Sequence, residues 1–193
     1  MVESVANAYD TSAERNVCRD LGLPDHQYEL SAEALSTNDW YELILSLNSK
    51  QYEVHQFIVD WCSKRLLTHR VRKLQPFHIF LTGGAGVGKS HLVRTIVQTV
   101  SRLLSRNEQA EENHILVCAP NGAAAYNIAG YTLHSAFLLP IHTRKTDDYI
   151  LLSSEKLASL KEAIGNVKVL VIDEISMVGN GMLSLIESRF FLK

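Results

Sequence analysis

The residues best suited to chemistry lie in a glycine-rich run, GGAGVGKS, which matches the pattern G-x-x-x-x-G-K-[ST] of a phosphate-binding loop. Glycines let the backbone turn its N–H groups inward around a phosphate, and the amino end of a following helix attracts the same anion. Lys89 is then placed to bridge the β- and γ-phosphates, and the Ser90 hydroxyl to bind Mg²⁺. The predicted nucleotide-binding residues are Gly83, Gly84, Ala85, Gly86, Val87, Gly88, Lys89 and Ser90.

Two carboxylates, Asp173 and Glu174, come directly after the apolar run Val169–Ile172, and Asp173 follows Lys89 by 84 residues (173 − 89). Open α/β sheets bind ligands at the carboxyl ends of their strands. Asp173 suits contact with Mg²⁺, and Glu174 suits orienting and polarising an attacking water. Alone, such an acidic pair is commonly only a charged helix start. After a phosphate-binding loop, we expect Glu174 to be catalytic together with Lys89.

Three short apolar runs are expected to be the strands that position these groups: Phe77–Leu81, Ile115–Ala119 and Val169–Ile172. Each is typical of a strand that is buried on both faces, as in a parallel sheet. Because helical patterns alternate with them, we expect an α/β fold built on a parallel sheet flanked by helices.

The helical patterns repeat apolar residues at spacings of three and four. One short helix is expected from an N-cap at Asn38, and a second from Asn48, with Val54, Phe57, Ile58 and Trp61 on its buried face. Further helices are expected at 91–105, with a stripe formed by Leu92, Ile96, Val100 and Leu103, and at 122–130, 157–164 and 182–190. Residues 1–37 are expected to be a weakly patterned lead-in, and 38–193 to be the N-terminal part of one domain. The basic stretch at 64–73 and the polar stretch at 143–154 are expected to be connectors.

The composition is that of a soluble globular domain, with 46% hydrophobic and 21% charged residues in a chain of 193. Lys plus Arg number 19 and Asp plus Glu 21, which gives a net charge of −2. This charge excludes a protein that coats nucleic acid with a basic surface all round, but it allows a local basic groove. No apolar run reaches the roughly 18 to 20 residues that cross a bilayer, and the first ten residues do not resemble a secretory signal. The spacing of Cys18, Cys62 and Cys118 fits neither a zinc site nor a disulfide framework, which favours a reducing compartment.

Four segments in order resemble the motifs of the Pif-one/RecD branch of superfamily 1 DNA helicases, including copies carried by rolling-circle transposons. They are the phosphate-binding loop, APNGAAA from Ala119, GYTLHS from Gly130 and IDEISMV from Ile172, and the last is especially specific. The resemblance covers about residues 47–190. It implies a RecA-like phosphate-loop NTPase that uses ATP and Mg²⁺ to move 5′ to 3′ on single-stranded DNA and to unwind the duplex ahead.

The resemblance also implies binding partners and a cellular location. The expected partners are single-stranded DNA and duplex-junction DNA, with no membrane and no predictable protein partner. The expected location is the nucleus, and the expected processes are DNA repair, recombination and telomere maintenance.

Individual residues take roles from the same resemblance. Gln51 matches the glutamine that contacts adenine, although Asn48 and Gln51 also have the spacing of a capping box. The expected DNA contacts are Pro120, Asn121, Gly122, Thr132, His134 and Ser135. The structural alternative for Pro120, Asn121 and Gly122 is a helix start, and the alternative for His134 is a half-buried polar side chain.

Two positions depart from the family pattern, because Asn121 and Val87 stand where Thr is usual. After Phe190 we find no match to the glutamine-bearing γ-phosphate sensor, the second RecA-like domain or its arginine finger. We therefore expect an incomplete sheet without a central strand, and a 193-residue chain that hydrolyses ATP little above background. Two other functions stay open: a nucleotide- or DNA-binding remnant without turnover, and an ATPase that loads or regulates another DNA enzyme.

Overall fold

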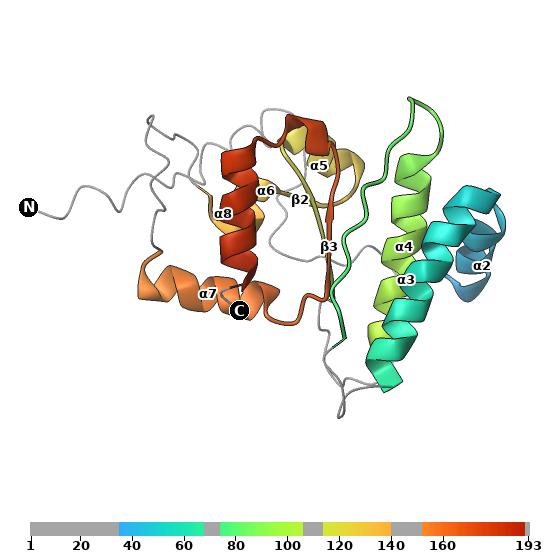
Figure 1. Cartoon of the computed structure of the whole chain (residues 1–193), viewed down its shortest axis with the longest axis horizontal. Helices are drawn as coiled ribbons and strands as arrows, with labels where there is room; N and C mark the ends of the chain where they lie inside the picture. Colours follow the sequence, from blue (N-terminus) through green and yellow to red (C-terminus); the bar gives the residue numbers. More distant parts are fainter. Residues whose placement is uncertain (1–34, 68–73, 106–113, 140–151, 192–193) are drawn as a thin grey trace, which may run out of the picture. The chain divides into compact units, whose positions relative to one another are not determined.

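The computed structural model describes residues 35–67, 74–105, 114–139 and 152–191 (Figure 1). These residues divide into two compact units, one ending at Ile115 and the other beginning at Leu116, and each is described by itself. Nearly all of the predicted lead-in lies outside the described residues. So do residues 68–73 of the predicted basic connector and 143–151 of the predicted polar loop.

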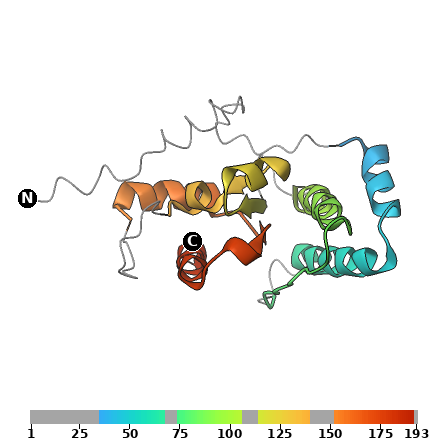
Figure 2. The same ribbon diagram turned by 90° about the horizontal axis from the view of Figure 1, so that it is seen from above.

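The first unit is built on three helices: α2 (Thr37–Leu45), α3 (Ser49–Leu67) and α4 (Lys89–Leu104). Helix α4 packs against both of the others, and Figures 1 and 2 show α3 and α4 side by side. The predicted stripe of α4 is confirmed at Leu92, Ile96 and Val100, with the buried Leu104 in place of Leu103. The side chains of α3 that are buried are those of His55, Ile58 and Cys62.

The start of α2 differs from the prediction. The side chain of Ser36, not Asn38, caps the helix by accepting a hydrogen bond from the backbone N–H of Asp39 at 3.1 Å. Asn38 therefore lies inside the first turn. Serine and asparagine are about equally good N-caps, so residue type alone could not separate two candidates two positions apart.

A buried hydroxyl joins all three helices of this unit. Thr99 Oγ1 lies 3.0 Å from Trp40 Nε1 and 2.9 Å from His55 Nε2, and it donates to the Thr95 carbonyl at 2.8 Å. The Arg102 guanidinium lies 5.2 Å from the centroid of the Trp40 ring and donates to the Leu35 carbonyl. The contact between α2 and α4 is therefore polar as well as apolar, which the apolar spacing of the helices did not predict.

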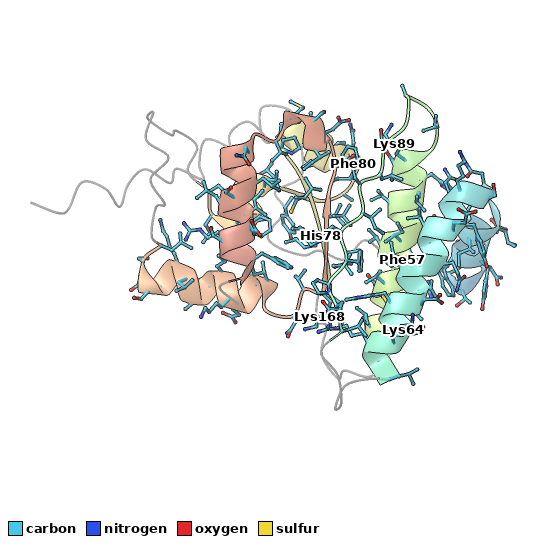
Figure 3. All side chains as sticks on the ribbon, viewed as in Figure 1. Phe57, Lys64, His78, Phe80, Lys89 and Lys168 are labelled. Atoms are coloured by element: carbon cyan, nitrogen blue, oxygen red, sulfur yellow. The ribbon has the colours of Figure 1, made fainter. Side chains whose placement is uncertain are left out.

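The run Phe77–Leu81 is not a strand, which corrects the prediction. It is extended backbone, and no strand among the described residues pairs with it. Phe77 packs edge-on against Phe57 and Trp61 of α3, with ring centroids 5.5 Å and 5.1 Å away. The side chains of Ile79 and Phe80 are 43% and 74% exposed (Figure 3 labels Phe80). An apolar run predicts burial, but a strand also needs a neighbour to complete its ladder.

The second unit contains a three-stranded sheet in the order β2-β1-β3, formed by β1 (Ile115–Ala119), β2 (Tyr131–Thr132) and β3 (Val169–Ile172). Strands β1 and β2 are parallel, and Cys118 is paired with Tyr131. The prediction of β1 as a fully buried strand is confirmed. In β3 only Val169 is buried, because among the described residues this strand has a neighbour on one side only. Strand β2 was not predicted.

Helices pack around this sheet: α5 (Gly122–Asn127), α6 (Leu133–Phe137), α7 (Ser154–Ile164) and α8 (Asn180–Phe191), with a short 3₁₀ turn η2 (Ile175–Met177). The core of the unit is formed by Leu116, Cys118, Leu133, Phe137, Leu139, Leu160, Ile164, Val167 and Ile186. Gly130 marks a close approach, because a Cβ atom there would lie 2.5 Å from the carbonyl oxygen of Val117 in β1. The predicted α/β class is thus confirmed. No helix among the described residues is long and apolar enough to span a membrane.

Candidate functional site

The phosphate-binding loop leads directly into α4, as the motif requires. Gly86 and Gly88 have φ angles of +75° and +83°, which side chains other than glycine rarely tolerate. Gly88 is the N-cap of α4 and supplies no side-chain cap, so the first N–H groups of the helix stay available for an anion. Ser90, in the first turn, is exposed.

The Lys89 side chain folds back over its own loop. Its Nζ donates to the carbonyl oxygens of Gly83 and Gly84, at 2.9 Å and 2.8 Å (Figure 3 labels Lys89). These two carbonyls hold the ammonium group beside the loop. Val87 closes the same turn, because a Cβ atom at Gly83 would lie 2.9 Å from Val87 Cγ2. A side chain at position 83 would therefore require Val87 to shift.

Gln51 is brought to this loop from the first turn of α3. Its Nε2 donates to the carbonyl oxygens of Val87 and Gly88, each at 3.2 Å. Its Oε1 accepts from the backbone N–H of Asn48 at 2.9 Å, and Asn48 Oδ1 accepts from the N–H of Gln51 at 3.0 Å. The capping box, one of the two alternatives for Gln51, is therefore present.

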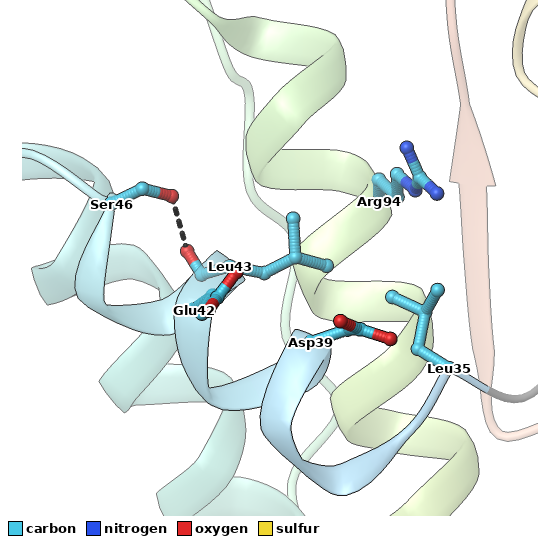
Figure 4. A pocket seen from close by; sticks show the side chains of 6 residues that line it. All are labelled: Leu35, Asp39, Glu42, Leu43, Ser46 and Arg94. Atoms are coloured by element: carbon cyan, nitrogen blue, oxygen red, sulfur yellow. Dashed lines mark hydrogen bonds between the residues drawn. The ribbon is translucent and has the colours of Figure 1, made fainter.

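The residue after Ser90 makes a link that the sequence did not predict. His91 Nε2 lies 2.8 Å from Oγ of Ser46, which is the C-cap of α2. Ser46 also lines an open pocket between α2 and α4 with a volume of about 420 Å³ (Figure 4). The pocket is lined by Leu35, Asp39, Glu42, Leu43, Ser46 and Arg94. It contains none of the residues predicted for nucleotide binding.

In the second unit, Asp173 and Glu174 follow β3 as predicted. The backbone N–H of Asp173 donates to the carbonyl of Cys118 in β1, at 2.9 Å, so pairing with β1 continues one residue past the strand. Asp173 Oδ1 accepts from the N–H of Glu174 at 3.0 Å. Glu174 is exposed and has φ +49° and ψ +42°. This left-handed conformation is strained for a residue with a side chain, and such strain clusters at functional sites.

The residues predicted to contact DNA lie at the starts of two short helices. Asn121 Oδ1 caps α5 by accepting from the N–H of Ala124 at 2.9 Å. Thr132 Oγ1 caps α6 by accepting from the N–H of Ser135 at 3.1 Å, and the Ser135 hydroxyl donates to the Thr132 carbonyl at 3.0 Å. His134 is half-buried. A helix start was the structural alternative for Pro120 to Gly122, and a half-buried side chain was the alternative for His134; both are present, whereas the cap at Thr132 was not predicted.

A contact within the second unit joins two of the motifs. Asn121 Nδ2 lies 3.6 Å from the sulfur of Met177, in the turn that follows Glu174. Pro120 and Gly122 flank Asn121. A Cβ atom added at Gly122 would meet nothing within 4 Å. The structure thus brings the APNGAAA and IDEISMV segments together. The phosphate-binding loop belongs to the other unit and is described separately.

The two cysteine thiols in the described ranges are buried. Burial raises the pKa of the Cys118 thiol to about 12, and burial, opposed by Arg65, raises that of Cys62 to about 11. Both cysteines are free thiols. Within the ranges that the structure describes, no three His, Cys, Asp or Glu side chains form a cluster that could hold a metal ion. Ser90 and Asp173, which the sequence predicts to bind Mg²⁺, carry oxygen donors of the type that Mg²⁺ prefers.

Comparison with known proteins places the chain among helicases. A family model described as PIF1-like helicase matches residues 46–190. The chain is 33% identical over 120 residues to "ATP-dependent DNA helicase Pif1" of Campylobacter jejuni, covering 58% of this chain and 24% of that protein. It is 36% identical over 110 residues to "ATP-dependent DNA helicase RRM3" of Saccharomyces cerevisiae, covering 57% and 14%. The match therefore spans about a quarter or less of the length of these relatives. No solved structure gives a significant match.

Proposed function

Because the chain belongs to the family of PIF1-like helicases, an enzymatic family, we propose that it supplies the ATP-binding part of a DNA helicase. In this proposal ATP hydrolysis drives movement 5′ to 3′ along single-stranded DNA and separates the duplex ahead. The substrates are single-stranded DNA and duplex-junction DNA. For the whole protein, the proposal includes a location in the nucleus and a role in DNA repair, recombination or telomere maintenance.

The observation that carries the proposal is the geometry of residues 83–90. Two glycines with positive φ and an uncapped helix start present backbone N–H groups to an anion. Lys89 Nζ is held by two carbonyl oxygens, which are neutral acceptors. Phosphate oxygens are charged and make stronger bonds to an ammonium group. We therefore expect Lys89 to exchange Gly83 and Gly84 for the β- and γ-phosphates when ATP binds.

Mg²⁺ would be held by Ser90 and Asp173 and would neutralise charge on the phosphates. The exposed Ser90 hydroxyl and the second carboxylate oxygen of Asp173 are the oxygen donors proposed for it. Glu174 is proposed to orient and polarise the water that attacks the γ-phosphate. Its exposed carboxylate and strained backbone support this role.

DNA contact is proposed for Pro120, Asn121, Gly122, Thr132, His134 and Ser135. The caps use Asn121 Oδ1 and Thr132 Oγ1, whereas Asn121 Nδ2 has a thioether sulfur as its partner among the described residues. A thioether is a weak acceptor, so a phosphate oxygen can replace it. Helix starts also bind phosphates through backbone N–H groups. The caps would thus fix the two segments against the DNA backbone.

A second function is favoured by the segment Phe77–Leu81. Because this segment pairs with no described strand, the loop that it carries is anchored mainly by α3 and α4. A chain that binds nucleotide and DNA but turns ATP over slowly would fit this observation. An ATPase that loads another DNA enzyme has no specific observation in its favour.

The experiment that tests the proposal is calorimetric titration of the chain with ATP and Mg²⁺. A charge-assisted contact is worth roughly 1.5–3 kcal/mol, so Lys89→Ala should weaken binding by about one to two decades. The matched control is Lys161→Ala, which removes an exposed lysine of α7. Equal affinity of the Lys89→Ala variant and the parent chain would refute the nucleotide site. DNA-stimulated ATP hydrolysis that is lost in Glu174→Gln would separate the helicase proposal from the slow-turnover alternative.

A further inference from the structure

Helix α5 exposes one face to solvent, and that face carries a single aromatic ring. Its exposed residues are Gly122, Ala123, Tyr126 and Asn127, whereas Ala125 is buried. Because residues four apart share a side of a helix, the four exposed residues lie together. The first turn of this face carries only a glycine and an alanine, and Tyr126 in the next turn is 56% exposed. The ring therefore lies beside a stretch of nearly bare backbone.

The first turn of α5 leaves room for a flat ligand next to this ring. A Cβ atom at Gly122 would meet nothing within 4 Å, so the Tyr126 ring does not fill the space above that turn. Side chains of a helix lean toward its amino end, so the ring leans toward this space. A single exposed aromatic residue is ordinary on a protein surface. A ring at the edge of an open, bare turn has, in addition, a face that a second flat ring can reach.

The residue before this face, Asn121, places a polar group beside the same space. Asn121 Oδ1 caps α5, and Nδ2 lies 3.6 Å from the sulfur of Met177, whose side chain is 59% exposed. The surface around Asn121 thus combines an amide donor with an exposed thioether and an exposed aromatic ring, all within the unit that begins at Leu116. Sites that bind single-stranded nucleic acid combine contacts to the backbone with aromatic side chains on which bases stack.

From this arrangement we propose that Tyr126 is a base-stacking residue for single-stranded DNA. Its ring stacks on the face of one base, while Asn121 contacts the DNA backbone. Every base has such a face, so the contact accepts any sequence. An intact duplex does not fit, because each base there is covered by its neighbours in the stack. The inference rests on the proposed DNA contact of Asn121, and it adds a residue that lies just outside the APNGAAA segment.

The test measures the affinity of the 193-residue chain for two strands of equal length at low salt, where phosphate contacts are strongest. One strand is oligothymidylate, and the other is the same sugar-phosphate strand without bases. Tyr126→Leu keeps an apolar side chain but removes the ring. It should bind oligothymidylate about ten times more weakly than the parent chain, because the stacking of one base is lost, and it should bind the abasic strand equally well.

Two further variants at the same position separate the ring from the fold. Tyr126→Phe keeps the ring and should match the parent chain on both strands. Tyr126→Gln removes the ring but suits an exposed helix position, so it should show the same selective loss as the Leu variant. The matched control is Tyr41→Leu, which removes a ring of similar exposure, 53%, from α2 in the other unit. It should leave both affinities unchanged.

The outcomes separate this inference from the DNA contact on which it rests. Equal affinity of the two ringless variants and the parent chain for oligothymidylate would overturn the inference and leave the contact at Asn121 in place. An equal loss on both strands would also overturn it, because the lost contact would then be to the backbone. A parent chain that binds neither strand would refute the proposed DNA contact and the inference together.

Discussion

Thr99 Oγ1 lies 2.9 Å from Nε2 of His55, in the buried contact between α4 and α3. A hydroxyl has one hydrogen, and Thr99 donates it to the Thr95 carbonyl. With that hydrogen on the Thr95 carbonyl, Thr99 accepts from Trp40 and from His55, whose Nε2 then carries a proton. His55 Nδ1 has no hydrogen-bond partner among the described residues, so a second proton there would be buried without an acceptor.

The stability of this unit should depend on pH through His55. Burial lowers the pKa of His55 below its usual value of 6.5. Above pH 6.5 the folded and unfolded chains both hold a neutral imidazole, and no contribution arises. As the pH falls below 6.5, the unfolded chain binds a proton that the folded chain resists, so the free energy of unfolding decreases. Urea unfolding between pH 7.5 and 5.5 measures this decrease.

The control for the pH dependence is His55→Gln, which keeps an amide donor toward Thr99 but does not titrate. Its unfolding free energy should change less with pH than that of the parent chain over the same interval. Identical slopes for the two proteins would contradict the assignment of the pH dependence to His55.

Removing the shared hydroxyl should destabilise the chain. Thr99→Val has almost the same volume but leaves the Trp40 and His55 N–H donors without their acceptor. An unsatisfied buried donor costs about 1–3 kcal/mol, and Trp40 is only partly buried, so we expect a loss of about 2–4 kcal/mol. Denaturant unfolding measures it. Thr99→Ser, which retains the hydroxyl, should recover most of the loss, and a Val variant as stable as the parent would refute the hydrogen-bond network.

The backbone strain at Glu174 should be measurable. Its left-handed conformation costs about 1 kcal/mol for a residue with a Cβ atom. Glu174→Gly should therefore raise the free energy of unfolding by about 1 kcal/mol relative to Glu174→Ala, which shares the loss of the carboxylate but keeps the strain. Thermal melts of the two variants give the comparison. A glycine variant less stable than the alanine variant would show that the backbone there is not strained.

Asn121 should be a structural cap as well as a proposed DNA contact. Asn121→Ala removes the acceptor for the Ala124 N–H and should cost about 1 kcal/mol. Asn121→Asp keeps the cap but brings a negative charge toward the phosphates. We expect the Asp variant to retain stability while binding single-stranded DNA more weakly, with the difference shrinking at high salt. Equal DNA affinity for the Asp variant and the parent chain, in fluorescence anisotropy, would remove Asn121 from the DNA contacts.

The helices other than α6, and two of the three predicted strands, could be predicted because their signals are local. The stripe Leu92, Ile96 and Val100 fixes the buried face of α4, and the uniform apolar character of Ile115–Ala119 fixes β1. The run Phe77–Leu81 shows where local signals fail. Its composition is that of a buried strand, but strand formation depends on a neighbour that can lie far along the chain.

The candidate site was likewise predicted where its signals are local and missed where its contacts are distant in sequence. The loop motif predicted the placement of Lys89 at the start of α4, because the spacing of the glycines encodes a local turn. The sequence left two alternatives at Gln51, and only the distances to Val87 and Gly88 show how the amide is used. The Ser46–His91 link was missed, because neither residue type nor spacing indicates a contact across 45 positions.

The unpaired segment Phe77–Leu81 has a colloidal consequence. No strand among the described residues pairs with its backbone N–H and C=O groups, which lie beside the exposed Ile79 and Phe80 side chains, and the segment contains no proline or formal charge that would block a second chain. Such a stretch can template strand addition between molecules. Addition of a strand from a second copy at this segment would lower the solubility of the protein, so concentrated solutions carry a risk of aggregation there.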